Sequence, residues 1–250
     1  MKKYLYIIIQ KTNLDFKSIL NRLTIFKLRH FEISAIYSTN NCGIPTHTLN
    51  KLFSDLILQI SITSLKFFEN HPNIPKYVYD HGEHYKLLHA LVKVLKPKNI
   101  VEIGTFTGLS SLTFLDAMDN LMILHTFDII PYSLIENSAI TEKDFKDNNI
   151  IQYICNLDDF ENIKKHKNIL QNADLIFIDA PKDGVFEKNI LINLKKIGIK
   201  NKTIIMFDDI KQWNMLKIWS DIKMPKIDIT AFGHFTGSGL IEYDSSLSFF

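Results

Sequence analysis

The feature that most constrains this chain is an alternation, from residue 99 onward, of short apolar runs with segments of helical periodicity. The runs predict strands at Ile100–Ile103, Met122–Phe127, Ile150–Cys155, Leu175–Ile178 and Thr203–Phe207. Runs such as LIFI at Leu175–Ile178 show no polar alternation, which is typical of parallel strands covered by helices on both faces. Successive strand–helix units of this kind predict an open α/β sheet.

The segments between and after these strands predict the helices of the sheet. They are Leu109–Met118, Ser133–Lys146, Asp159–Leu170, Val185–Ile197 and Ile210–Ile222. The C-terminal part differs, because the apolar runs Lys226–Thr230 and Leu240–Tyr243 flank a glycine-rich loop that leaves no room for a helix. We therefore expect the last two strands to pair in antiparallel fashion.

The first 79 residues have a different pattern, with helical periodicity at Leu14–Phe31 and Leu49–Phe68. Asp80 and Glu83 then have the spacing of a helix cap, and the helix they begin ends before Pro97. We expect residues 1–79 to form a mostly helical extension and residues 80–250 to form the main domain. The extension is expected to serve as a lid, a homodimer contact or a surface for another partner.

Bulk properties exclude several classes of protein. The net charge is +2 and the mean hydropathy is near zero, so nothing indicates a nucleic-acid partner. No apolar stretch reaches 18 residues, and the N-terminal run ending at Lys11 lacks the features of a signal peptide. Cys42 and Cys155 form no disulfide framework, which indicates a reducing, cytoplasmic location. Residues 1–30 are basic, and we interpret them as a solvated face, with contact to anionic lipid or a polyanionic substrate as the alternative.

The segment Asn99–Ser111, NIVEIGTFTGLSS, predicts a strand, a glycine turn and a helix N-terminus in succession. Such a turn brings backbone N–H groups and the positive end of a helix dipole toward a ligand, which suits a carboxylate or a phosphate. The order of residues from Glu102 is E-x-G-x-x-x-G, whereas dinucleotide-binding turns have G-x-G-x-x-G. A tight turn without any ligand is the alternative interpretation.

Polar or acidic residues follow every predicted parallel strand after the first. They are Asp128, Asn156 with Asp158, Asp179, and Asp208 with Asp209. Because the carboxyl ends of parallel strands meet at one edge of a sheet, and ligands of open α/β sheets bind at that edge, we expect these side chains to share a site. Asp128 has the position of an acid that binds ribose hydroxyls, although it could instead cap a helix after Pro131.

Asp179, Asp208 and Asp209 are expected at the tips of adjacent strands. Carboxylates so placed repel one another unless a cation lies between them, and an all-oxygen set suits Mg²⁺ or another hard divalent ion. The alternative is that Asp208 and Asp209 cap the helix predicted at Ile210–Ile222 and bind no metal.

Four motifs in this order, VEIGTFTG, the FD ending at Asp128, FIDAPK and IIMFDDI, resemble those of class I S-adenosylmethionine-dependent methyltransferases. The resemblance is to the metal-dependent small-molecule O-methyltransferases, which include the catechol, caffeoyl-CoA and antibiotic-sugar enzymes. It covers the chain from about Asp80 to Tyr243 and implies a Rossmann-like, seven-stranded methyltransferase sheet. It also implies S-adenosylmethionine as cofactor and a divalent cation such as Mg²⁺.

The resemblance implies roles for residues of the motifs. Glu102 and the turn Gly104, Thr105, Phe106 and Gly108 would bind the methionine part of the cofactor; Asp128 would bind the ribose; Asn156 and Leu157 would lie near the adenine. Asp179 would line the cofactor site and, with Asp208 and Asp209, hold the metal. Lys182 would match the general base of the catechol enzyme. Asp209 stands where the catechol and caffeoyl-CoA enzymes have asparagine, which brings the chain closer to the sugar-modifying group.

The expected reaction is methyl transfer to a hydroxyl of a small molecule or a carbohydrate. Lys182 is the first candidate for the proton acceptor, against the alternative of a surface lysine, and His234 in the glycine-rich loop is the competing base, against a structural role. Three other functions stay open at this point. They are a metal-free methyltransferase that uses His234 or an acid as base, an NAD-dependent oxidoreductase, and a non-catalytic interaction protein on a methyltransferase scaffold.

Overall fold

The computed structural model describes residues 43–65, 68, 71, 74, 84–147 and 149–250. The helix predicted at Leu14–Phe31, the basic residues 1–30, Cys42 and the cap residues Asp80 and Glu83 lie outside this part of the chain. Within the described part, no helix is both long enough and apolar enough to cross a membrane.

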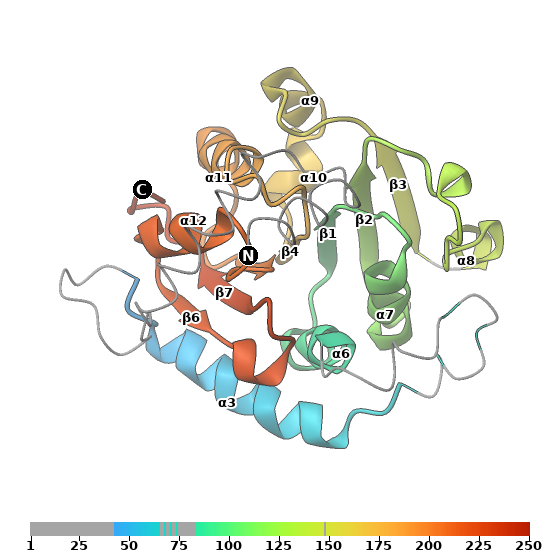
Figure 1. The fold of residues 1–250 in the computed structure, drawn as a ribbon, viewed down its shortest axis with the longest axis horizontal. Helices are drawn as coiled ribbons and strands as arrows, with labels where there is room; N and C mark the ends of the chain where they lie inside the picture. The colour runs from blue at the N-terminus through green and yellow to red at the C-terminus, as the bar shows by residue number, and fades with distance from the viewer. Residues whose placement is uncertain (1–42, 66–67, 69–70, 72–73, 75–83, 148) are drawn as a thin grey trace, which may run out of the picture.

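The described residues form a seven-stranded sheet with the strand order β3-β2-β1-β4-β5-β7-β6 (Figure 1). The parallel strands are β1 (Asn99–Ile103), β2 (Ile123–Asp128), β3 (Ile150–Ile154), β4 (Leu175–Ile178) and β5 (Ile204–Asp208). β7 (Ser238–Glu242) runs antiparallel to β5 and to β6 (Lys226–Asp228). This order confirms the predicted Rossmann-like sheet, and its topological switch point lies between β1 and β4.

Helices cover both faces of the sheet, so two hydrophobic cores form. One core contains residues of α3 (His47–Ile62), α6 (His84–Leu95) and α7 (Leu109–Ala117). The other contains residues of α9 (Phe160–Lys165), α10 (Lys167–Gln171), α11 (Phe186–Ile197) and α12 (Met215–Asp221). Because β4 and β5 are buried on both faces, their side chains are apolar along the whole run until the strand ends.

α3 belongs to the predicted N-terminal extension and begins at the cap residue Thr46, whose side chain accepts a hydrogen bond from the Leu49 N–H at 3.0 Å. It packs against α6 and against the C-terminal strands β6 and β7 (Figure 1). The boundary between extension and main domain at residue 80 stays a prediction.

The helix predicted at Ser133–Lys146 is wrong. The segment instead forms a short 3₁₀ helix, η1 (Tyr132–Leu134), a connecting loop, and α8 (Glu142–Asp147). The loop is held to the glycine turn, because the Ala139 N–H donates to the Thr107 carbonyl at 2.8 Å. Ala139 and Ile140 are buried, and Ile140 lies against Gly108 of that turn, so contacts with the turn fix this segment as a loop.

Two further helices differ from their predicted bounds. The helix predicted at Asp159–Leu170 is divided at His166 into α9 and α10. The helix predicted at Ile210–Ile222 begins only at Met215, because Asp209 has a φ of +57° and the N–H groups of Ile210 and Lys211 donate to the loop before β7. Asn214 therefore occupies the cap position of α12, and neither Asp208 nor Asp209 caps it.

Candidate active site

The glycine turn follows β1, next to the end of the neighbouring strand β4. Gly104 has a φ of +104°, and a Cβ added to it would lie 1.9 Å from the Asp179 carbonyl oxygen. The strands also exchange hydrogen bonds there, since the Asp179 N–H donates to the Ile103 carbonyl at 2.9 Å. Only glycine fits this position, and its absent side chain lets the ends of β1 and β4 meet beneath a common cavity.

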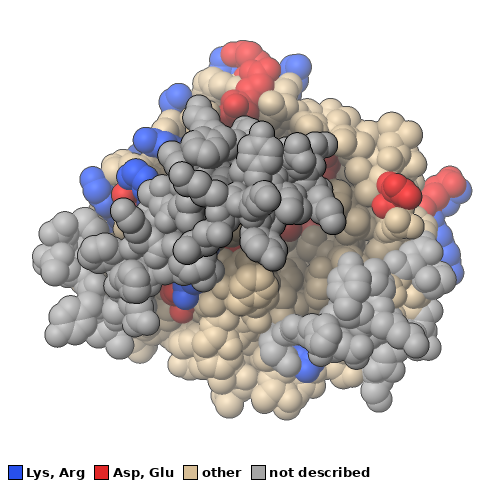
Figure 2. All heavy atoms as spheres, in the orientation of Figure 1, with Lys and Arg blue, Asp and Glu red and all other residues tan. Residues whose placement is uncertain are grey.

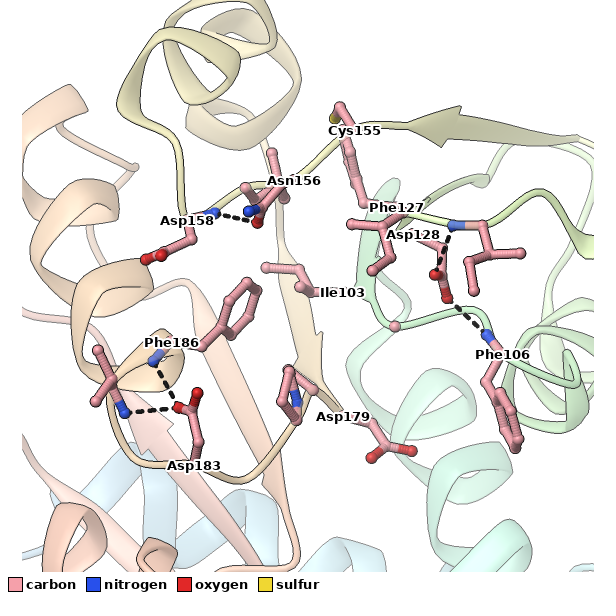
Figure 3. Close-up of a pocket in the computed structure, with 17 residues that line it drawn as sticks. Ile103, Phe106, Phe127, Asp128, Cys155, Asn156, Asp158, Asp179, Asp183 and Phe186 are labelled. Atoms are coloured by element: carbon pink, nitrogen blue, oxygen red, sulfur yellow. Dashed lines mark hydrogen bonds between the residues drawn. The ribbon is translucent and has the colours of Figure 1, made fainter.

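Asp128, at the end of β2, holds the glycine turn in shape. Its Oδ2 accepts hydrogen bonds from the N–H groups of Thr105 and Phe106, both at 2.9 Å, and its Oδ1 accepts one from Ile130 at 3.1 Å. Figure 3 shows the bond between Asp128 and Phe106. The N–H groups of Thr105 and Phe106, expected to be bare, are therefore already paired. Asp128 also lines the cavity that lies above the turn.

A cavity of about 460 Å³ opens at the carboxyl ends of the parallel strands. Its apolar residues include Ile103, Phe127, Leu157 and Phe186, and its acids include Asp128, Asp158, Asp179 and Asp183. Figure 3 shows Asp128 and Phe106 on one side of this cavity and Asp183 and Phe186 on the other. A volume of this size with mostly apolar walls and a few polar groups is typical of a small-molecule site.

A second cavity of about 440 Å³ adjoins the first. Two residues, Phe106 and Asp179, line both cavities. The second cavity also contacts His84, Tyr85 and the start of α7. The two cavities therefore meet at Phe106 and Asp179, and we call them together the elongated site.

Most of the predicted cofactor residues lie in this site. Asn156 and Leu157 line the first cavity, and the Asn156 Oδ1 accepts a hydrogen bond from the Asp158 N–H at 2.9 Å. Glu102 and Gly108 are the exceptions, because they line neither cavity. Glu102 is fully buried behind the turn, where the Ser111 hydroxyl donates to it, and Gly108 faces Ile140. Burial raises the pKa of Glu102 to about 7.

The three predicted metal ligands lie together at the ends of β4 and β5. Asp179, Asp208 and Asp209 each offer an oxygen, and these oxygens lie within 4.8 Å of one another. Burial, followed by the nearby Asp208 charge, raises the pKa of Asp179 to about 6. Together these carboxylates form an all-oxygen cluster, and through Asp179 it borders both cavities.

Lys182 lies among these carboxylates. Its Nζ pairs with Asp179 and lies 3.1 Å from the Asp209 Oδ2. Burial works to lower the pKa of Lys182, but the charges of Asp179 and Asp209 outweigh it and raise that pKa above its usual range. In this arrangement Lys182 is a cation that neutralises the carboxylates, and it is not ready to accept a proton.

His234 reaches the same cluster from the loop between β6 and β7. Its Nε2 lies 2.8 Å from the Asp208 Oδ1, and its Nδ1 contacts the Thr236 hydroxyl. Burial works to lower the pKa of His234, but the hydrogen bond and charge of Asp208 outweigh it and raise that pKa. The structure thus brings both predicted base candidates, Lys182 and His234, to the carboxylates.

His84, at the first position of α6, is a site residue that sequence reasoning missed. Its Nδ1 lies 3.7 Å from the Asp208 Oδ1, and its ring centroid lies 4.5 Å from that of His234. Burial lowers the pKa of His84. No spacing along the sequence links His84 to the strand ends, because the packing of α6 on the sheet brings it there.

On the outer surface, charged residues are more scattered than at the ends of β4 and β5. In the face shown in Figure 2, Lys and Arg mix with Asp and Glu mainly along the edge of the described surface. The described atoms toward the centre of that face belong mainly to uncharged residues. The dense group of ionisable side chains at the ends of β4 and β5 thus contrasts with the mixed charges of this face.

Comparison with known proteins agrees with this geometry. A family model for O-methyltransferases matches residues 66–241. The Dictyostelium discoideum protein "Probable caffeoyl-CoA O-methyltransferase 3" is 28% identical over 197 residues, which cover 76% of this chain and 70% of that protein.

Solved structures are also similar to this chain. The "putative O-methyltransferase from Klebsiella pneumoniae" is 16% identical with a TM-score of 0.51, over 79% of this chain and 100% of that one. The O-methyltransferase of Bacillus cereus, solved with SAH, is 18% identical with a TM-score of 0.46, over 80% of this chain and 93% of that one. The family match excludes an NAD-dependent oxidoreductase and favours an enzyme over a non-catalytic protein. Because that match spans most of its length, the chain belongs to the O-methyltransferase family, a class I family of S-adenosylmethionine-dependent enzymes.

Proposed function

We propose that this protein transfers a methyl group from S-adenosylmethionine to a hydroxyl of a small molecule or a carbohydrate, with the help of a divalent cation such as Mg²⁺. The observation that supports this most is the position of Asp179, which lines both cavities and belongs to the carboxylate cluster. A donor in the elongated site and an acceptor held at the carboxylates would therefore be neighbours.

The cavities fit the cofactor in size and in chemistry. The first would take the adenosine, with Asn156 and Leu157 near the adenine and Asp128 near the ribose. The Asp128 Oδ1 accepts one backbone hydrogen bond and keeps a lone pair for a ribose hydroxyl. The methionine part would extend past Gly104, Thr105 and Phe106 toward the second cavity. When bound, S-adenosylmethionine supplies an electrophilic methyl group on its sulfonium.

The carboxylate cluster fits a hard divalent cation. Asp179, Asp208 and Asp209 present only oxygen ligands. The ammonium of Lys182 pairs with two of them, Asp179 and Asp209, so these acids already hold a positive charge. When bound, such a cation acts as a Lewis acid that lowers the pKa of a hydroxyl on the acceptor. We assign these three acids as its ligands.

Lys182 is the proton acceptor that this proposal favours, because its Nζ lies at the carboxylates where the acceptor hydroxyl would bind. The same carboxylates raise its pKa, so Lys182 becomes a base only where a cation offsets their charge. Asp209 stands where the catechol and caffeoyl-CoA enzymes have asparagine, which makes the chain more similar to the sugar-modifying enzymes. This favours a sugar-like acceptor. The free thiol of Cys155 is consistent with a reducing, cytoplasmic location for the reaction.

The experiment that tests this function is a product assay on the purified full chain. S-adenosylmethionine affinity is first measured by calorimetry, and S-adenosylhomocysteine is then quantified by mass spectrometry with vicinal-diol sugars, catechols and caffeoyl-CoA as acceptors. We expect product that depends on one acceptor class, falls about 100-fold or more with EDTA and returns with Mg²⁺. Failure to bind S-adenosylmethionine would contradict the proposal.

A metal-free methyltransferase is the second candidate. The short contact between the His234 Nε2 and the Asp208 Oδ1 favours it, because a carboxylate that orients a histidine is a common arrangement for a general base. In that case Lys182 would only neutralise Asp179 and Asp209. Full activity after chelation, together with loss of activity in His234→Gln but not in Lys182→Met, would support this candidate over the first.

A further inference from the structure

Three side chains from distant parts of the chain converge on one side of the carboxylate cluster. His84 begins α6, Asp208 ends β5, and His234 lies in the loop between β6 and β7. Their candidate ligand atoms all lie within 4.8 Å of one another. The Asp208 Oδ1 lies closest to both histidines, at 2.8 Å from the His234 Nε2 and 3.7 Å from the His84 Nδ1.

His84 is otherwise unexplained by the fold. Its side chain is almost entirely buried, and its Nδ1 has no hydrogen-bond partner among the described residues. Edge-on contacts with Tyr85 and His234, at 5.1 Å and 4.5 Å between ring centroids, hold the imidazole in place. Buried polar atoms in native proteins are nearly always paired, so an unpaired nitrogen facing a carboxylate indicates a missing ligand.

We propose that His84, His234 and Asp208 form a metal site that binds a transition metal ion such as Zn²⁺ in preference to Mg²⁺. Two imidazole nitrogens and one carboxylate oxygen are the ligands that Zn²⁺ and similar ions select, whereas Mg²⁺ prefers oxygen alone. With metal–ligand bonds of about 2.1 Å, neighbouring ligand atoms lie about 3.0–3.4 Å apart. The separations of 2.8 Å and 3.7 Å bracket that range, so small movements of the rings suffice.

This inference deepens the proposed function and rests on it in one respect, since the nitrogen-containing site shares Asp208 with the proposed all-oxygen ligands. It also changes the role of His234, which becomes a metal ligand and is then unavailable as the base. Lys182 would be left as the proton acceptor. Asp179 and Asp209 belong only to the all-oxygen set, so the two sets can be separated by mutation.

The test measures metal binding by the full chain without cofactor or acceptor. Chelator-treated protein is titrated with Zn²⁺ and with Mg²⁺ by calorimetry, and with Co²⁺ by visible absorption, for wild type, His84→Gln and His234→Gln. His89→Gln is the matched control, because His89 lies on the same helix but pairs with Asp116 at 3.3 Å, away from this site. A thermal unfolding midpoint close to that of wild type shows that each variant is folded.

We expect each of the two site variants to lose about 100-fold or more in Zn²⁺ affinity, because even indirect partners of a metal typically contribute 10- to 100-fold. Mg²⁺ affinity should change less than about threefold, His89→Gln should bind like wild type, and the Co²⁺ spectrum should change only in the site variants. Wild-type Zn²⁺ affinity in His84→Gln and His234→Gln would overturn the inference. Equal losses for Zn²⁺ and Mg²⁺ would also overturn it, since the histidines would then only orient Asp208.

Should His84→Gln fold poorly, His234→Gln and the wild-type Co²⁺ spectrum decide the matter. A wild-type spectrum identical to that of His234→Gln would overturn the inference. Failure here is distinguishable from failure of the proposed function. Methyl transfer with Mg²⁺ and unaltered Zn²⁺ binding in the variants would remove only the nitrogen-containing site. Absent S-adenosylmethionine binding with histidine-dependent Zn²⁺ binding would remove only the methyltransferase proposal.

Discussion

The sheet edge formed by the carboxyl ends of the parallel strands has two halves, and their polar groups are paired to different extents. At the ends of β1 and β2, Asp128 accepts three backbone hydrogen bonds and the hydroxyl oxygens of Thr105 and Thr126 lie 2.6 Å apart, so the polar groups of the glycine turn are already paired. At β4, β5 and the β6–β7 loop, acids, histidines and one lysine crowd together. The first half therefore has its shape before any ligand binds. The second half holds crowded charged side chains that a bound cation would balance.

The largest effect is expected where the halves meet, at Gly104. Gly104→Ala places a Cβ 1.9 Å from the Asp179 carbonyl, so we expect a loss of about 4 kcal/mol or more in the free energy of unfolding. Gly198→Ala is the matched control, because Gly198 also has positive φ but nothing lies within 4 Å, and it should lose only about 1–2 kcal/mol. Urea denaturation measures both. Equal losses would show that the close approach of β1 and β4 does not matter.

Removal of a charge from the second half should stop turnover without releasing the cofactor. We expect Asp179→Ala to lower kcat at least about 100-fold, or about 3 kcal/mol, because an acid of the cluster is lost. Calorimetry should show S-adenosylmethionine affinity within about threefold of wild type. Asp221→Ala, on the outer end of α12, is the control and should leave both values unchanged. Lost cofactor affinity with unaltered metal dependence would assign Asp179 to the first half.

Glu102 is the buried acid of the first half, and its ionisation should make stability depend on pH. Its pKa of about 7 in the folded state lies above the ordinary value of 4.5, so folding takes up a proton between these values. Stability should therefore decrease as pH rises from about 4.5 to 7, by up to about 3 kcal/mol. Thermal denaturation of Glu102→Gln should lack most of this slope, and an identical slope in both proteins would contradict the assignment.

The smallest effect is expected at Asp128, where only hydrogen bonds are lost. Asp128→Ala removes the acceptor for the N–H groups of Thr105, Phe106 and Ile130, so the turn should loosen and S-adenosylmethionine should bind about tenfold more weakly, or about 1.4 kcal/mol. Asp128→Asn keeps one acceptor and should lie between. Calorimetric affinities equal to wild type would show that the first half does not depend on this carboxylate.

The sequence predicted the sheet and the acids at its edge for a simple reason. Buried parallel strands are continuous apolar runs, and the first polar residue after each run falls where the strand ends. This placed Asp128, Asp179 and Asp208 at the correct edge, although their roles as ligands stay predictions. The resemblance then supplied a family, which the match to residues 66–241 confirmed.

The errors came where tertiary contacts overruled local pattern. The segment predicted as a helix at Ser133–Lys146 contains Ala139 and Ile140, which instead pack on the glycine turn. The positive φ of Asp209 delayed the start of α12, and no sequence signal announced it. His84 was not predicted as a site residue, because only the packing of α6 on the sheet brings it near Asp208. The second half of the edge, built from distant segments, was accordingly the harder one to predict.

A crystal structure of the protein grown with S-adenosylmethionine and Mn²⁺ tests the central claim, that this edge joins a donor cavity to a cation site. We expect adenosine density beside Asp128 and Leu157, and the sulfonium near Asp179 where the cavities meet. Anomalous signal from Mn²⁺ should lie at the carboxylates of Asp179, Asp208 and Asp209. Cofactor density elsewhere, or carboxylates that hold no cation while Lys182 stays paired with Asp179, would contradict the account.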